Sequence, residues 1–155
     1  MKRMKKFLIL LLVSICLVGA IPFRTEAASQ WNDLGSGWKI RLDPPHDGGA
    51  HGKWHVHVQN GNGSIKAAEN VDGTKHDGST LDKLAKKVKE KARGSSSYKK
   101  GKDNQKKTNA AKVEIKRRGL NWNNVLHVVA IIAILVVFGI AAYFTGGAAA
   151  FAVFA

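Results

Sequence analysis

Apolar and polar residues alternate along two short stretches in the first half of the chain. Residues 38–43 read WKIRLD and residues 53–59 read KWHVHVQ, so that every second side chain is apolar in much of each stretch. This period of two is typical of a β-strand with one buried face. The NGNG sequence at 60–63 then predicts a hairpin turn, and residues 64–71, SIKAAENV, supply a return strand.

A second pattern, with apolar residues three and four positions apart, follows at residues 79–94, STLDKLAKKVKEKARG. It predicts an amphipathic helix that begins at Ser79 or Thr80 and ends at Gly94. The order of the elements indicates an α+β fold, in which a small antiparallel sheet of about three strands packs on one amphipathic helix. The expected core consists of Trp38, Ile40, Leu42, Trp54, Val56, Val58, Ile65, Leu81, Leu84 and Val88.

The N-terminus predicts a secretory signal peptide over residues 1–28. Basic residues precede an uninterrupted apolar run at 7–23 and the small residues of TEAAS follow, with cleavage expected after Ala27 or Ala28. An uncleaved signal anchor is the alternative, since the apolar run lies at the lower limit of spanning length. The single cysteine, Cys16, lies inside this run, so the mature chain would contain neither a disulfide nor a cysteine-ligated metal.

The C-terminal part predicts a hydrophobic membrane segment over residues 119–155. No Asp, Glu, Lys or Arg occurs after residue 118, and the apolar stretch 125–143 suits a transmembrane helix with Trp122 and Tyr143 as interfacial anchors. With a cleaved signal, the protein would be single-pass, with its main domain outside the cell membrane. The basic residues just before the helix favour the opposite orientation, and the placement of residues 144–155 stays open.

Positive charge is concentrated between these parts. The chain has a formal net charge of +14, most of which falls in residues 82–118. We therefore expect a small extracytoplasmic domain at 30–93, followed by a basic flexible linker at 94–118. The basic segment would bind anionic lipid or wall polymer. The residues expected to do so are Lys83, Lys86, Lys87, Lys89, Lys116, Arg117 and Arg118.

Histidines between positions 46 and 76 are the strongest candidates for chemistry. His55 and His57 share one strand face, because residues two apart on a strand point the same way, while the apolar residues beside them supply the core on the other face. With His76 they could hold a divalent metal ion. They could instead act with His46 as general acid and base on a phosphodiester, or form an ordinary solvated polar face. Other possible third ligands are His46, His51, Asp47 and Asp77.

Three motifs around these histidines, DPPH at 43–46, HVHVQNGNG at 55–63 and NVDGTKHDG at 70–78, precede the basic helix. In this order they resemble a small domain at the C-termini of bacterial polymorphic toxins. They are also similar to a short uncharacterised domain that is marked by a PPH-x-HV pattern. The resemblance covers about residues 38–93 and implies a nucleic-acid-cleaving domain with His46, His55, His57 and His76 at its site. Two departures weaken it: DGGAHGK separates the Pro-Pro-His from the His-Val-His, and an apolar segment follows the domain.

These features lead to two main functional hypotheses. The first is a secreted, membrane-tethered cell-envelope protein of Gram-positive type that displays a small binding or interaction domain on a cationic stalk. The second is a toxin-like nuclease or metal-dependent hydrolase that uses the His55/His57 pair, with nucleic acid as its substrate. The motifs of serine hydrolases, P-loop proteins and zincins are absent from the sequence. A third interpretation makes the apolar C-terminus membrane-active in the manner of a bacteriocin.

Overall fold

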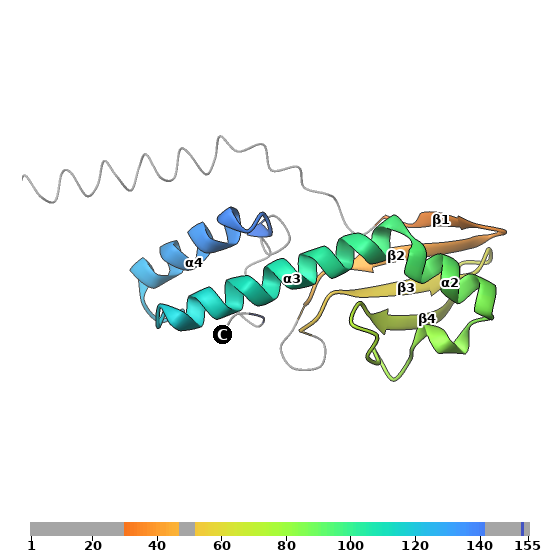
Figure 1. Ribbon diagram of the computed structural model, residues 1–155, viewed down its shortest axis with the longest axis horizontal. Coiled ribbons are helices and arrows are strands. Elements are labelled where there is room, and N and C mark those ends of the chain that lie inside the picture. Colours follow the sequence, from red (N-terminus) through yellow and green to blue (C-terminus); the bar gives the residue numbers. More distant parts are fainter. Residues whose placement is uncertain (1–29, 47–51, 142–152, 154–155) are drawn as a thin grey trace, which may run out of the picture.

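The computed structural model describes residues 30–46, 52–141 and 153. The expected signal peptide and residues 144–152 lie outside these ranges. The fold is α+β, with a four-stranded antiparallel sheet covered on one face by helices (Figure 1). The strands are β1 (Asn32–Gly35), β2 (Trp38–Asp43), β3 (His55–Gln59) and β4 (Ile65–Asn70). The helices are η2 (Leu81–Lys83), α2 (Lys86–Gly94), α3 (Ser96–Arg117) and α4 (Val125–Val137).

The sheet is a meander with strand order β1-β2-β3-β4. The alternation of WKIRLD and KWHVHVQ is confirmed by the register, in which Ile40 and Ala67 both pair with Val58. β1 was not expected, because NDLG shows no apolar alternation. A tight turn at residues 35–37, with positive φ at all three positions, folds it onto β2. The predicted sheet of about three strands therefore has a fourth strand at its edge.

The main core lies between the sheet and the helices. Of the expected core, Ile40, Trp54, Val56, Val58 and Leu81 are buried. Four others, Trp38, Leu42, Leu84 and Val88, are partly buried against the same cluster. Ile65 was wrongly assigned to the core and is 52% exposed, because a register shift at the end of β3 leaves it opposite Gln59.

The expected amphipathic helix over 79–94 is interrupted. A 3-10 turn, η2, comes first and is capped by the Thr80 hydroxyl, which accepts from the Asp82 amide at 3.3 Å. The chain is then extended at Leu84, and α2 begins at Lys86. The Leu81 amide, at the start of η2, donates to the buried carboxylate of Glu69 at 3.0 Å and so ties this turn to β4.

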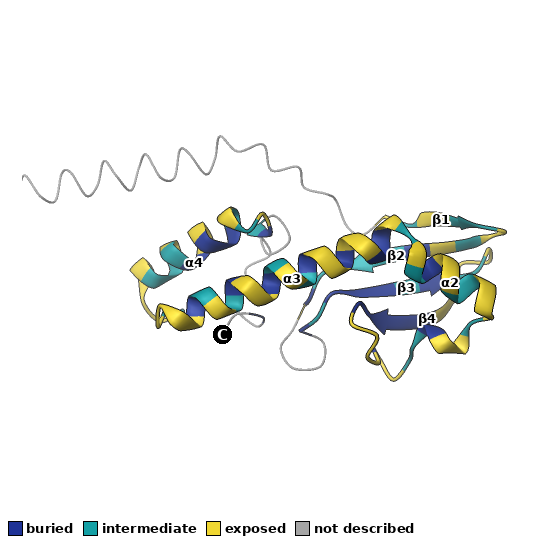
Figure 2. Cartoon of the chain, viewed as in Figure 1, coloured by how far each residue is buried: buried dark blue, intermediate teal, exposed yellow. Residues whose placement is uncertain are grey.

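Residues 94–118 are not the flexible linker that the sequence predicts. Residues 96–117 form α3, whose first turn is capped by Ser95 accepting from the Tyr98 amide at 3.2 Å. The side of α3 that packs on the sheet and on α4 is buried, and the opposite side is exposed (Figure 2). Its buried residues are Ser97, Tyr98, Gly101, Asn104, Thr108, Ala111 and Ile115. Most of these are small or polar, so they give no hydropathy signal in the sequence.

The helix expected over 125–143 is shorter than predicted. α4 begins after the Asn124 cap and ends at Val137, followed by Gly139 with a φ of +67°. Within the described ranges, no helix combines the length and the apolarity needed to cross a membrane. α4 packs instead beside the C-terminal half of α3, where Ile131, Ile134 and Leu135 form a second apolar cluster with Ala111 and Ile115.

Gly101 marks the place where α3 comes closest to the sheet, and it supplies a test of this packing. A Cβ at this position would lie 2.7 Å from both Leu42 Cδ1 and Val71 Cγ1. We expect Gly101→Ala to lower the free energy of unfolding by about 1–3 kcal/mol through overpacking, although alanine is the better helix former by about 1 kcal/mol. Urea unfolding of the full chain measures this.

Gly94→Ala is the matched control, because a Cβ on Gly94 would meet no atom within 4 Å. This variant should be neutral or slightly stabilised. If Gly101→Ala were as stable as Gly94→Ala, α3 would not dock on the sheet as described.

Candidate functional site

The face of the sheet opposite the helices carries the histidines of β3. His55 lies between Asp43 on β2 and Asn70 on β4, and His57 lies between Arg41 and Ala68. The valines that alternate with these histidines point to the helix-covered core. His55 is nonetheless 1% exposed, so other groups must cover it on this side.

His76 is one of the groups that cover His55. Its ring is stacked on the His55 ring, with centroids 3.6 Å apart and planes inclined by 15°. A two-residue turn at Asp77 and Gly78, with φ values of +49° and +69°, fixes its position. The His76 amide donates to the Ser79 carbonyl at 3.0 Å, and the Ser79 amide donates back at 2.9 Å. The Asp-Gly pair is a common sequence signal for such a turn, but it does not predict which strand the turn will pack against.

The remainder of this loop is tied to β4. The Asn70 side-chain amide donates to Thr74 Oγ1 at 3.0 Å and to the Lys75 carbonyl at 2.8 Å. Lys75 also forms an isolated bridge with Glu69. The loop that the sequence showed only as a polar segment is therefore folded back along β4, which holds His76 against the sheet.

His46 approaches from the other side, after β2 and Pro44-Pro45. Its ring centroid lies 5.1 Å from that of His55 and 6.0 Å from that of His76, edge-on in both cases. It is exposed. The next residues, including the candidate ligands Asp47 and His51, lie outside the described ranges.

Two overlapping groups of side chains bring metal-ligating atoms together. In the first, His46, His55 and His76 each offer one nitrogen, and these atoms lie within 4.8 Å of one another. In the second, a carboxylate oxygen of Asp43 and one nitrogen each of His55 and His57 lie equally close together. The expected set of His55, His57 and His76 is thus divided between two groups that share His55. Because the His55 and His76 planes are nearly parallel, one ring must turn before both can bind one ion.

His55 is oriented as a metal-ligating histidine usually is. Its Nδ1 lies 3.1 Å from the Lys53 carbonyl oxygen, which can only accept, so we assign the proton to Nδ1 and the free lone pair to Nε2. The pKa of His55 is lowered to about 4, mainly by burial and also by the nearby His76 and His57 rings, while the Lys53 hydrogen bond and the Asp43 charge oppose the shift. The imidazole is therefore neutral at pH 7.

His57 is held by a carboxylate. Its Nε2 lies 3.3 Å from Asp43 Oδ2, and the same oxygen accepts from Arg41 Nε at 2.9 Å and pairs with Nη2 at 2.8 Å. Burial lowers the pKa of His57, and the Asp43 charge opposes that shift. With the Nε2 proton directed to Asp43, Nδ1 carries the lone pair, and this buried atom has no hydrogen-bond partner within the described part of the chain.

The basic residues named from the sequence are only partly available to an anionic partner. Lys89 pairs with Asp82 at 3.1 Å, and Arg117 and Arg118 both bind Glu114, which lowers the pKa of that carboxyl to about 2. Lys83, Lys86, Lys87 and Lys116 are exposed.

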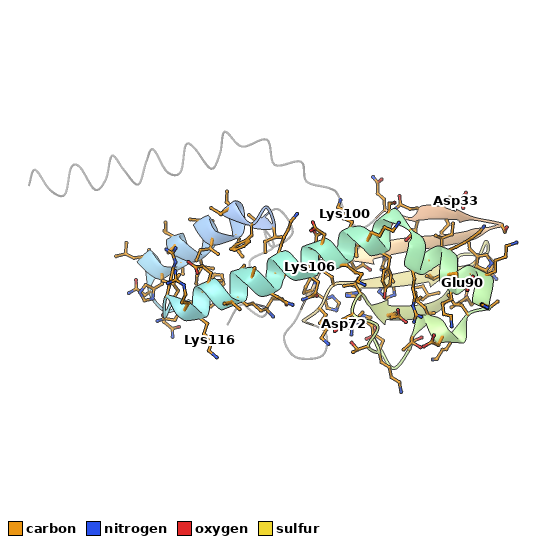
Figure 3. The ribbon with its side chains drawn as sticks, in the orientation of Figure 1. Asp33, Asp72, Glu90, Lys100, Lys106 and Lys116 are labelled. Carbon is orange, nitrogen blue, oxygen red and sulfur yellow. The ribbon has the colours of Figure 1, made fainter. Side chains whose placement is uncertain are left out.

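A second row of cations lies on the exposed side of α3, and Figure 3 labels one of its members, Lys106. Lys99, Lys102 and Lys106 have spacings of three and four residues and are exposed. Among the described residues none of the three has an ion-pair partner. The sequence analysis missed this row because it predicted no helix there.

We expect His55 of the metal-free protein to stay neutral well below the ordinary imidazole range. Its pKa is about 4 in the folded chain against the ordinary imidazole value of 6.5, so between these pH values the unfolded chain binds a proton that the folded chain does not. The free energy of unfolding should therefore decrease as the pH falls from 6.5 to 4.

Nitrogen-15 NMR of the imidazoles and urea unfolding at several pH values check this. His55→Asn should lose part of the pH dependence. A His55 resonance that titrates near 6.5 in the folded protein would contradict the burial described here.

No protein-family model matches the chain, and no match is found among curated proteins or solved structures. The resemblance to toxin domains stays a prediction that rests on the short histidine motifs.

Proposed function

We propose that this protein binds a divalent transition-metal ion at the histidine cluster and uses it to hydrolyse phosphodiester bonds. The observation that carries the proposal is the convergence of nitrogens from His46, His55 and His76 within 4.8 Å. Three imidazoles with one coordination position left open are the ligand set of several catalytic zinc sites. The ion would supply a polarised water or phosphoryl oxygen.

The buried position of His55 supports its role as the central ligand. Both candidate groups contain it, and its Nδ1 contact with a backbone carbonyl directs Nε2 toward the cluster. A neutral imidazole needs no deprotonation before it binds a metal. Zn²⁺ suits this nitrogen-rich set best, because imidazole binds it well and the site has no thiolate.

The Asp43–His57 pair has the arrangement of a general base and its orienting carboxylate. Asp43 fixes the ring through Nε2, and His57 Nδ1 is then the atom that can accept a proton. In the proposed step a water oxygen bonds to phosphorus, its proton passes to His57, and the bond to the leaving oxygen breaks. The leaving oxygen is protonated by solvent.

The charge around the site favours an anionic substrate. Arg41 lies beside the His57–Asp43 pair, and its guanidinium is also 5.0 Å from the Trp31 ring centroid. The chain has a net charge of +14, which attracts polyanions in general, while the exposed lysine row of α3 lies on the helix-covered side of the sheet and not beside the histidines. A nucleic-acid strand is therefore the substrate class that we propose, in agreement with what the toxin resemblance implies.

A second candidate function is the binding module on a cationic stalk that the sequence also predicts. The exposed lysine row Lys99, Lys102 and Lys106 on a rigid helix favours it. In this case the protein would bind an anionic polymer of the cell envelope without cleaving it, and affinity would fall with added salt.

We expect the metal-free full chain, in detergent, to bind one Zn²⁺ ion in isothermal titration calorimetry. His55→Ala should weaken the affinity at least about 100-fold, since it removes a ligand and not merely a supporting group. His46→Ala should weaken Zn²⁺ binding if the ion is held by His46, His55 and His76, and Asp43→Asn should weaken it if the ion is held by Asp43, His55 and His57, because each of these two residues belongs to only one group. His127→Ala, on α4, is the control. Unchanged Zn²⁺ affinity in His55→Ala would exclude the proposed site.

We expect the zinc-loaded full chain to cleave fluorescently labelled single-stranded RNA or DNA. His57→Asn should reduce kcat by about 10²–10⁴-fold with little change in Zn²⁺ affinity, because it removes the proposed base but none of the three histidine ligands. Cleavage by a His55→Ala, His57→Ala double variant at the wild-type rate would overturn the hydrolase. Salt-sensitive binding of the strand without cleavage would favour the binding module instead.

A further inference from the structure

α4 exposes a row of large apolar side chains. Val125 is 79% exposed, Leu126 58%, Val129 41%, Ile132 42% and Val137 82%. Helices on a protein surface normally present polar residues to water, and monomers seldom leave large apolar patches uncovered. The opposite side of α4 already packs on α3 through Ile131, Ile134 and Leu135. The outer side therefore needs a different apolar partner.

Charge near α4 indicates the chemistry of that partner. Lys116, Arg117 and Arg118 are exposed at the end of α3, immediately before the turn into α4. Arg117 and Arg118 share the single carboxylate of Glu114, so this end of α3 keeps an excess of positive charge. Glu114 is their only acidic neighbour in sequence, and no Asp or Glu follows it. An apolar helix face next to cations matches the boundary between acyl chains and anionic headgroups. A second copy of the chain would bring like charges together.

The length of α4 decides how it would meet a bilayer. It has 13 residues, about 20 Å at 1.5 Å per residue, whereas the hydrocarbon core is about 30 Å thick. A helix of this length suits a position in the plane of the interface. It also stays attached to α3 by the cluster around Ala111 and Ile115.

We propose that the hairpin of α3 and α4 docks on an anionic lipid bilayer, with the outer face of α4 among the upper acyl chains and Lys116, Arg117 and Arg118 at the headgroups. This docking does not depend on the histidine site or on its chemistry. It differs from the transmembrane helix expected from the sequence, because α4 lies on the membrane surface and keeps its contact with α3.

A local probe tests the docking in the full chain. The apolar run at 7–23 could by itself attach the chain to vesicles, so total binding is not informative. In a Cys16→Ser background, an environment-sensitive NBD label is placed at Val129→Cys on the outer face of α4. The matched control is Val113→Cys, another exposed valine (67%) but on α3. Circular dichroism checks that both labelled chains fold.

On phosphatidylglycerol vesicles, the label at position 129 should shift to shorter wavelength and lose several-fold in its quenching by aqueous iodide. The label at position 113 should stay accessible to iodide. Phosphatidylcholine vesicles should give a weaker effect at 129, because the cations gain nothing from neutral headgroups. Equal accessibility at the two positions would overturn the proposal. So would a shift at 129 that appears without vesicles and grows with protein concentration, which would identify a second copy as the partner.

Discussion

The buried carboxylate of Glu69 is the interaction on which the rest of the fold depends. It is fully buried, and both oxygens accept hydrogen bonds: Oε1 from Arg93 Nε and the Tyr98 hydroxyl, Oε2 from Arg93 Nη2 and the Leu81 amide. A buried charge is tolerated only when its hydrogen-bonding capacity is filled in this way. These donors come from η2, α2 and α3, so one side chain of β4 fixes three helical elements on the sheet. Burial and the hydrogen bond that the Tyr98 hydroxyl donates to Glu69 together raise the pKa of Tyr98.

Asn70, which follows Glu69 in β4, makes the equivalent anchoring hydrogen bonds on the other face of the sheet. Because successive strand residues point to opposite sides, Asn70 faces the histidines while Glu69 faces the helices. Asn70 holds the loop at Thr74 and Lys75, and that loop carries His76 to its stack on His55. Core and site are thus joined through two adjacent residues, and the position of the site follows from the packing of the helices.

The chemistry proposed for the site depends on desolvation. His55 is neutral because it is buried among other imidazoles, where a positive charge is unfavourable. His57 combines burial with a carboxylate neighbour, an arrangement that keeps a ring oriented and able to take a proton. Arg41 lies beside the Asp43–His57 pair, whereas the exposed lysines of α2 and α3 and the cations before the turn into α4 lie away from the histidines.

The local pattern of the sequence was sufficient to predict those features that depend only on residues close together in the chain, namely strand faces and a hairpin turn. The period of two in β2 and β3 determined that His55 and His57 share a face opposite the core, and NGNG determined the hairpin between β3 and β4. Only the tertiary structure decided that His46 and His76 join His55, since their approach depends on chain that folds back over the sheet. It also decided that α3 is a helix and that α4 packs on it. Four of the seven buried residues of α3 are Ser97, Gly101, Asn104 and Thr108. They pack through close backbone contact and hydrogen bonding, and neither of these raises the hydropathy of the sequence.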